Sequence, residues 1–218
     1  MYKIAYIDES RDDRNNFLQY VKYADSARFF EFEVIEPEHP LDAFVVKLLE
    51  GHYHAFIIDF FLSEKNSRIK YDGWSLAEQI LEIRDNFPIF ILTAREDDAL
   101  NGSDDVNIVY EKNKIVHGEN DGGFLEKVKL QIEKYERRVS KAEQRILALL
   151  AAQKSRTLTY TEENELVENS IFIEKTLNKT ASVPIDLQSQ SGEKHLDDIL
   201  SLLKKMEFEL QEHNKNKK

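Results

Sequence analysis

Five side chains that could hold a cation or an anionic group lie where short apolar runs of this sequence end. They are Asp8 and Glu9 after KIAYI, Asp59 at the end of AFIID, Thr93 at the end of IFILT, and Lys112 after VNIVY. Asp59 closes the hydrophobic stretch HAFIID and is followed by FFL. A buried carboxylate is costly unless it is paired, hydrogen-bonded or metal-bound, so Asp59 requires a partner.

These side chains suit phosphoryl chemistry. Three neighbouring carboxylates cannot all stay ionised without a cation, because like charges raise one another's pKa. Oxygen ligands of this kind suit Mg²⁺, which binds through one or two carboxylates together with phosphate oxygens and water. A lysine ammonium and a threonine hydroxyl can hold the other oxygens of a phosphoryl group. Asp59 would then be the nucleophile that forms an aspartyl-phosphate.

The elements that must position these groups follow from the hydrophobic pattern. Five strands are predicted, at residues 3–7, 30–35, 55–59, 89–93 and 106–110. Four of them are nearly continuous apolar runs, which are typical of a parallel sheet covered on both faces, whereas FEFEVI alternates with charge and is predicted at an edge. Helical patterns fill the gaps, so we expect a doubly wound α/β domain. In such sheets ligands bind beyond the carboxyl ends of the strands.

The second part of the chain has a different pattern. Apolar residues step alternately by four and three over Val128, Ile132, Tyr135, Val139, Ala142, Ile146 and Leu149. This heptad seam predicts a long helix over residues 122–153, either in an intermolecular coiled coil or packed within its own chain. Further helices are predicted over Thr161–Lys179 and His195–Glu212. We therefore expect one domain at residues 1–135 and an all-α helical output or dimerisation module at residues 136–218.

The motifs YIDE, AFIIDFFL, YDGWSLAEQI, IFILTARE and IVYEKN, in this order, resemble the receiver domain of two-component response regulators over roughly residues 1–135. The resemblance implies a flavodoxin-like, five-stranded parallel sheet. It also implies a phosphoryl group transferred to the aspartate from a sensor histidine kinase or phosphotransfer protein. The roles it implies are Asp59 as phospho-acceptor, Asp8, Glu9, Asp59 and the backbone carbonyl of Phe61 as Mg²⁺ ligands, Thr93 as switch hydroxyl and Lys112 as the invariant lysine.

The sequence departs from the family pattern on the side that reads out phosphorylation. The family's aromatic residue three positions before the lysine is Val109 here, and Tyr110 is expected on the opposite face. The proline that usually follows the lysine is Asn113, and the short segment after Thr93 leaves room for only a reduced fourth helix near EDDALNG. The loop after Leu62 is longer than usual. The resemblance thus leaves open an output that does not depend on phosphorylation.

Several other residues have simpler interpretations. Asp12 and Asp13 are expected to cap the first helix, since acids favour helix N-termini. His195 is expected to be an exposed residue near a helix start rather than a phosphotransfer histidine. His52 and His54 lack partners at metal-ligand spacing.

Composition limits the other functions. The formal net charge is -11, and neither half of the chain has the basic excess that binding to phosphate backbones favours. The segments SKAEQRILALLAAQ and SIFIEKTLNK faintly resemble a helix-turn-helix, so a DNA-binding regulator is an alternative. The acidic segment TYTEENELVEN between them argues against this alternative.

We expect a signalling switch with a protein target and a possible homodimer, rather than an enzyme. An auxiliary phosphatase using Gln144 or Gln153 is the enzymatic alternative. The chain has no cysteine and no apolar run long enough to span a membrane, so a cytoplasmic protein is expected.

Overall fold

Five parallel strands form one sheet in the computed structural model, which describes residues 1–64, 66–94, 109–112, 115 and 123–176. The strands are β1 (Tyr2–Ile7), β2 (Phe30–Ile35), β3 (Ala55–Asp59), β4 (Ile89–Thr93) and β5 (Val109–Glu111). Their order is β2-β1-β3-β4-β5, and every neighbouring pair is parallel. This is the flavodoxin-like order of a doubly wound sheet, so the predicted fold class is confirmed.

The burial of each strand follows its place in the sheet. Every residue of β3 and β4 is buried, because both strands have neighbours on either side and helices cover both faces. β2 alternates in exposure and lies at an edge, as its FEFEVI pattern predicts. β5 forms the other edge, and the first part of its predicted range, residues 106–108, lies outside the described residues.

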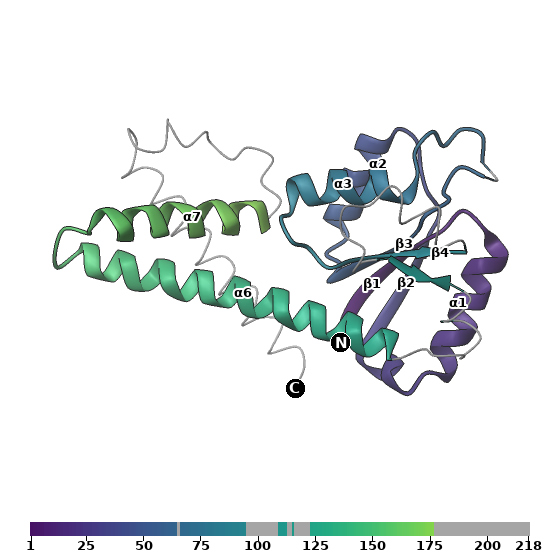
Figure 1. Cartoon of the computed structure of the whole chain (residues 1–218), viewed down its shortest axis with the longest axis horizontal. Helices are drawn as coiled ribbons and strands as arrows, with labels where there is room; N and C mark the ends of the chain where they lie inside the picture. The colour runs from purple at the N-terminus through teal and green to yellow at the C-terminus, as the bar shows by residue number, and fades with distance from the viewer. Residues whose placement is uncertain (65, 95–108, 113–114, 116–122, 177–218) are drawn as a thin grey trace. The chain divides into compact units, whose positions relative to one another are not determined.

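Helices cover the sheet in two layers (Figure 1). One buried cluster lies between the sheet and the helices α2 (Leu41–Glu50) and α3 (Gly73–Ile83). The other lies between the sheet and α1 (Arg11–Tyr23) together with the first turns of α6 (Phe124–Gln153). A short 3₁₀ helix, η1 (Asp25–Phe29), joins α1 to β2. The two apolar layers leave the carboxyl edge of the sheet for polar groups.

The starts of α1 and α3 explain how the chain turns at this edge. Ser10 is the N-cap of α1, and its hydroxyl accepts a hydrogen bond from the Asp13 N–H. The expectation that Asp12 and Asp13 cap this helix is therefore wrong: they lie further in, in its first turn. Asp72 caps α3 through the N–H of Ser75, at 2.8 Å. Both caps satisfy amide groups that the first helical turn leaves without partners.

The chain divides into two units, Met1–Arg137 and Arg138–Lys218, and the boundary falls within α6. In the second unit the last turns of α6 run beside α7 (Tyr160–Thr176), which confirms two of the predicted helices. Ala142, Ile146 and Leu149 of the heptad seam are buried within a single chain. The predicted helix His195–Glu212 lies outside the described residues, and the role of this unit as an output module stays a prediction.

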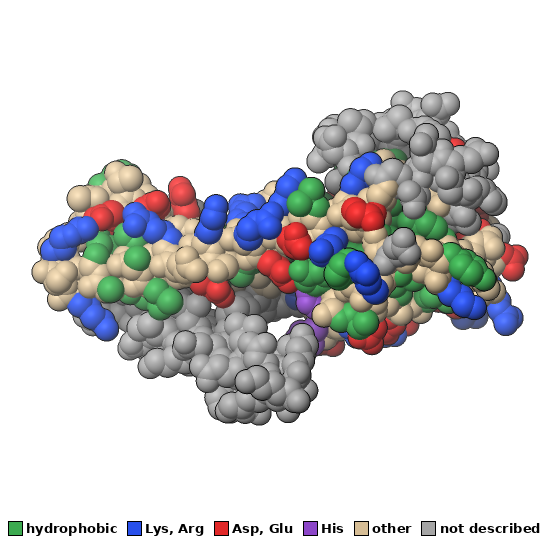
Figure 2. Space-filling model, turned by 90° about the horizontal axis from the view of Figure 1, so that it is seen from below, with side chains coloured by type: hydrophobic (Ala, Val, Ile, Leu, Met, Phe, Trp, Pro, Cys, Tyr) green, Lys and Arg blue, Asp and Glu red, His purple; other side chains and the backbone are tan. Residues whose placement is uncertain are grey.

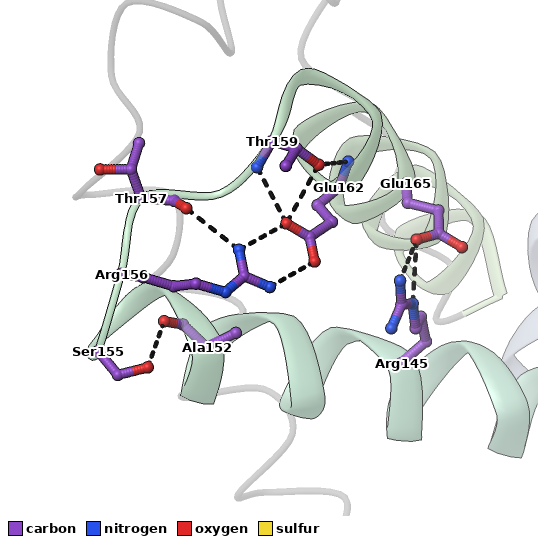
Figure 3. A network of polar contacts seen from close by, with 8 residues as sticks. All are labelled: Arg145, Ala152, Ser155, Arg156, Thr157, Thr159, Glu162 and Glu165. Carbon is purple, nitrogen blue, oxygen red and sulfur yellow. Dashed lines mark hydrogen bonds and ion pairs between the residues drawn. The ribbon is translucent and has the colours of Figure 1, made fainter.

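A polar network closes the turn between α6 and α7 (Figure 3). The Thr159 hydroxyl accepts from the Glu162 N–H, and the Glu162 carboxylate accepts from the Thr159 N–H at 2.9 Å, which makes a reciprocal capping box. Arg156 donates to both carboxylate oxygens of Glu162. One turn along, Arg145 pairs with Glu165. Together these contacts hold the two helices as an antiparallel pair.

Charges of both signs are interspersed on the face of the molecule that Figure 2 shows. In the described part of the chain, no helix is both long and apolar enough to cross a membrane.

Candidate functional site

The ammonium group of Lys112 lies among three carboxylates at the carboxyl edge of the sheet. Its Nζ is 2.8 Å from Asp8 Oδ2, 2.8 Å from Asp59 Oδ1 and 3.3 Å from Asp13 Oδ2. Asp8 follows β1, Asp59 ends β3 and Lys112 follows β5. Three of the predicted site residues are thus brought together from strands far apart in sequence. Asp13 joins them from α1.

Asp8 is held in one orientation by its other neighbours. The Tyr6 hydroxyl donates to Oδ2 at 2.6 Å, and the Ser10 N–H donates to Oδ1 at 2.7 Å. The Arg14 guanidinium donates to the Asp8 backbone carbonyl at 2.7 Å and also pairs with Glu36, which follows β2. Asp8 is fully buried, and these donors satisfy its carboxylate inside the protein.

The backbone around Asp59 is fixed by tight packing against α3. The next residue, Phe60, donates its N–H to Leu92 O and accepts from the Gly73 N–H, both at 2.8 Å. A Cβ on Gly73 would lie 2.1 Å from the Asp59 carbonyl oxygen. Only glycine fits at this first position of α3, because any side chain would push the strand end away.

Burial and like charge raise the pKa of Asp59. The pKa rises from 3.8 to about 7, chiefly because burial disfavours the charged carboxylate. Within this net rise, the Lys112 ammonium lowers the pKa of Asp59, and the carboxylates of Asp8 and Glu9 raise it. Burial alone lowers the pKa of Lys112, but Asp59 and Asp8 outweigh this effect and raise it, so the ammonium stays charged. The pKa of the Asp59 carboxyl therefore lies near neutral pH.

The remaining predicted residues lie at the same edge. Thr93 ends β4, is fully buried and pairs in register with Glu111, the residue before Lys112. Glu9 is partly buried and follows Asp8 directly. Phe61 is partly buried, and its ring meets that of Phe60 edge-on with centroids 4.9 Å apart.

The carboxylates of the site are of a type that fits a hard divalent cation. In the described part of the chain, no three His, Cys, Asp or Glu side chains are arranged as a metal-binding group. Mg²⁺ does not require such a group, since it binds through one or two carboxylates with waters and phosphate oxygens. Asp8 and Asp59, both within 2.8 Å of the same ammonium, supply two carboxylates. The roles of Glu9 and of the Phe61 carbonyl as ligands stay predictions.

The long segment after β3 folds back onto the α2 side of the sheet. Leu62, Ile69 and Tyr71 are buried in the same cluster as α2 and α3. The Tyr71 hydroxyl donates to the Glu38 carbonyl at 2.6 Å. The described residues of this insertion are therefore anchored by apolar side chains.

β5 presents its first two residues to opposite layers, as its sequence predicts. Val109 packs in the cluster beneath α2 and α3, and Tyr110 packs in the cluster beneath α1 and α6. The Tyr110 ring meets Phe124 of α6 edge-on, with centroids 5.2 Å apart, and Lys127 lies 5.4 Å from the centre of the Tyr110 ring. The aromatic residue nearest to Lys112 in the chain thus contacts α6.

Two site residues were not predicted. Tyr6 lies two residues before Asp8, and the alternation of a strand places both on one side, which is a usable signal. For Asp13 the sequence predicts helix capping alone. Its position in the first helical turn after the strand-end acids could have indicated that it reaches the same edge.

No protein-family model and no curated protein matches this chain. Solved structures match with low similarity. A yeast Spc42 trimeric coiled coil (amino acids 181–211) fused to another structure is 18% identical, with a TM-score of 0.44, and the match covers 70% of this chain and 95% of that one. The Mn²⁺-bound form of the response regulator Rcp1 is 19% identical, with a TM-score of 0.41, and the match covers 58% of this chain and 96% of that one.

The Escherichia coli constitutive lysine decarboxylase is 15% identical, with a TM-score of 0.40. The match covers 73% of this chain and only 21% of the decarboxylase. The fold assignment follows from the strand order and does not depend on these matches.

Proposed function

We propose that this protein is a response-regulator signalling protein in which Asp59 accepts a phosphoryl group. One observation carries the proposal: Lys112 Nζ lies 2.8 Å from both Asp8 and Asp59 at the carboxyl edge of a flavodoxin-like sheet. The motifs that resemble a receiver domain contribute these same residues. An isolated ion pair at a strand end would not require the second buried acid or the lysine from a distant strand.

Each residue has a defined part in the proposed transfer. An Asp59 carboxylate oxygen attacks phosphorus, a new O–P bond forms, and the bond from phosphorus to the donor's leaving atom breaks. Lys112 and the Thr93 hydroxyl donate hydrogen bonds to the phosphoryl oxygens as charge shifts. Asp8, with Glu9 and the Phe61 carbonyl, would hold Mg²⁺, which when bound neutralises phosphate charge and favours the ionised form of Asp59.

The proposed donor is a sensor histidine kinase or a phosphotransfer protein, and the proposed output is a change in protein–protein interaction or dimerisation through the C-terminal helices. Tyr110 supports a path to those helices, because it lies two residues before Lys112 and contacts Phe124 of α6. A ligand shifts a conformational equilibrium only through its different affinity for the two states. Exchange of a carboxylate partner of Lys112 for the phosphoryl group would supply that difference at the end of β5.

The test is phosphorylation of the full chain by acetyl phosphate with Mg²⁺, and binding of beryllofluoride, a phosphoryl mimic. We expect a mass increase of one phosphoryl group, lost on treatment with hydroxylamine, and neither phosphorylation nor beryllofluoride binding by Asp59→Asn. Asp42→Asn, an exposed acid on α2, is the control and should behave as wild type. Wild-type protein that stays unmodified and does not bind beryllofluoride would show that the site is structural.

The DNA-binding alternative has a separate test. α7 has five acidic residues and one lysine, a composition that disfavours contact with phosphate backbones. No binding to DNA at low salt is the expected result, and salt-dependent binding to the protein's own upstream DNA would support the alternative.

A further inference from the structure

The three N–H bonds of the Lys112 ammonium have three acidic partners, and these partners are not equivalent. An ammonium has three donors and no acceptor. Asp8 and Asp59 lie at 2.8 Å and have side chains exposed by 0% and 7%, respectively. Asp13 lies at 3.3 Å, and its side chain is 38% exposed. Asp13 is thus the longest contact and the only one of the three with ready access to water.

The position of Asp13 is built into the start of α1. Its N–H is capped by the Ser10 hydroxyl, and the Ser10 N–H is bound to the Asp8 carboxylate. Arg14, the next residue of α1, donates to the Asp8 carbonyl at 2.7 Å. Ser10 and Arg14, on either side of Asp13 in the chain, both hydrogen-bond to Asp8. These contacts fix the first turn of α1 and so place the Asp13 carboxylate beside Lys112.

An incoming phosphoryl group needs a hydrogen bond from Lys112, so one of the present partners must release it. Removing the partner of a buried carboxylate is costly, whereas an exposed carboxylate can exchange its partner for water. Asp13 is the partner that can leave at least cost. Its negative charge also opposes an anionic group that approaches the same ammonium.

We propose that Asp13 is a gate at the site: it holds the third N–H of Lys112 until a phosphoryl anion displaces it, and thereby weakens the binding of anionic phosphodonors. Asp13 is a positioning residue, because it acts through Lys112 and does not touch the transferred group. This inference rests on the proposed function of Asp59.

The test compares Asp13→Asn with Asp12→Asn in the full chain. Both substitutions remove one acid from the first turn of α1, and Asp12 is exposed, so the pair controls for net charge and for the helix dipole. Asparagine keeps the size of the side chain and leaves the capped N–H in place. Beryllofluoride is titrated at fixed Mg²⁺, and Mn²⁺ alone is titrated in a second series.

We expect Asp13→Asn to bind beryllofluoride about fivefold more tightly than wild type, with Asp12→Asn close to wild type. Mn²⁺ affinity should be the same in both variants. Equal or weaker beryllofluoride binding by Asp13→Asn overturns the gate. Mn²⁺ binding that is weaker in Asp13→Asn than in Asp12→Asn also overturns it, because Asp13 would then be a cation ligand.

The failure of the proposed function would be distinct. Wild type, Asp12→Asn and Asp13→Asn would then all fail to bind beryllofluoride, and the gate would fall together with the acceptor role of Asp59.

Discussion

At the scale of single residues, the charge state of Asp59 is set by competition between burial and Lys112. Burial and the neighbouring acids raise its pKa to about 7, even though an ammonium lies 2.8 Å away. The folded protein therefore binds the Asp59 proton more tightly than the unfolded chain does. A raised carboxyl pKa contributes stability at low pH that is lost as the pH rises towards the folded pKa. At neutral pH the ionised Asp59 carboxylate therefore destabilises the folded state, and it is the form that would attack phosphorus in the proposed transfer.

We expect Asp59→Asn to stabilise the protein above pH 7 by on the order of 2 kcal/mol. Near pH 5 most Asp59 is protonated in the folded state, so the gain should shrink as the pH falls from about 7 towards 3.8. Urea unfolding of both proteins at pH 5 and pH 8 measures this difference. The contrary outcome is a stability difference that is the same at both pH values, or one that grows at low pH.

At the scale of elements, the junction between β3 and α3 determines where the Asp59 carboxylate lies. Gly73 begins α3, is buried, and donates its N–H to the Phe60 carbonyl. The Asp59 carbonyl fills the space that a side chain on Gly73 would occupy. A helix and a strand end are thus packed backbone against backbone, and the position of Asp59, the proposed nucleophile, depends on that contact.

Gly73→Ala should therefore destabilise the protein by about 1–3 kcal/mol and weaken beryllofluoride binding, because the added methyl group must displace the end of β3. Glu78→Ala, an exposed position on the same helix, is the matched control and should change neither quantity measurably. Thermal unfolding and a beryllofluoride titration provide the two readouts. If Gly73→Ala binds the mimic as wild type does, α3 does not set the acceptor geometry.

At the scale of the whole molecule, the chain contains two units, each with buried apolar side chains of its own. In the helical unit, Ile146 is fully buried and the next residue, Leu147, is half exposed. Arg138 lies over the Phe172 ring at 4.4 Å, which adds a cation–π contact between α6 and α7. These contacts lie within the helical pair, so we expect that α6 and α7 can unfold locally while the unit that contains the sheet stays folded.

Ile146→Asp should unfold the helical pair, because it places an unpaired charge among apolar side chains and costs several kcal/mol. Leu147→Asp introduces the same charge one residue away on the exposed side and should be tolerated. We expect faster proteolysis between residues 138 and 176 in the first variant only, with beryllofluoride binding retained in both. Equal cleavage of the two variants, or loss of binding in Ile146→Asp, would contradict independent units.

The strands and the residues at their ends can be predicted from the sequence, because these signals are local. Continuous apolar runs predict β3 and β4 correctly, and the alternation of FEFEVI predicts an edge strand. In a parallel sheet the carboxyl ends of the strands meet at one edge, so the order of the motifs was enough to predict that Asp8, Asp59 and Lys112 lie together.

Which side chains complete the site, and how the heptad seam packs, depends on contacts between distant parts of the chain. The contact of Asp13 with Lys112 joins residues 99 positions apart. The sequence places Asp13 in the first turn of α1 near the strand-end acids, but it does not fix the direction of that turn towards Lys112. The seam had two interpretations, because a repeat of four and three serves a coiled coil and an intramolecular helix pair equally well. The folded chain buries Ile146 and Leu149 within itself, because α7 returns beside α6.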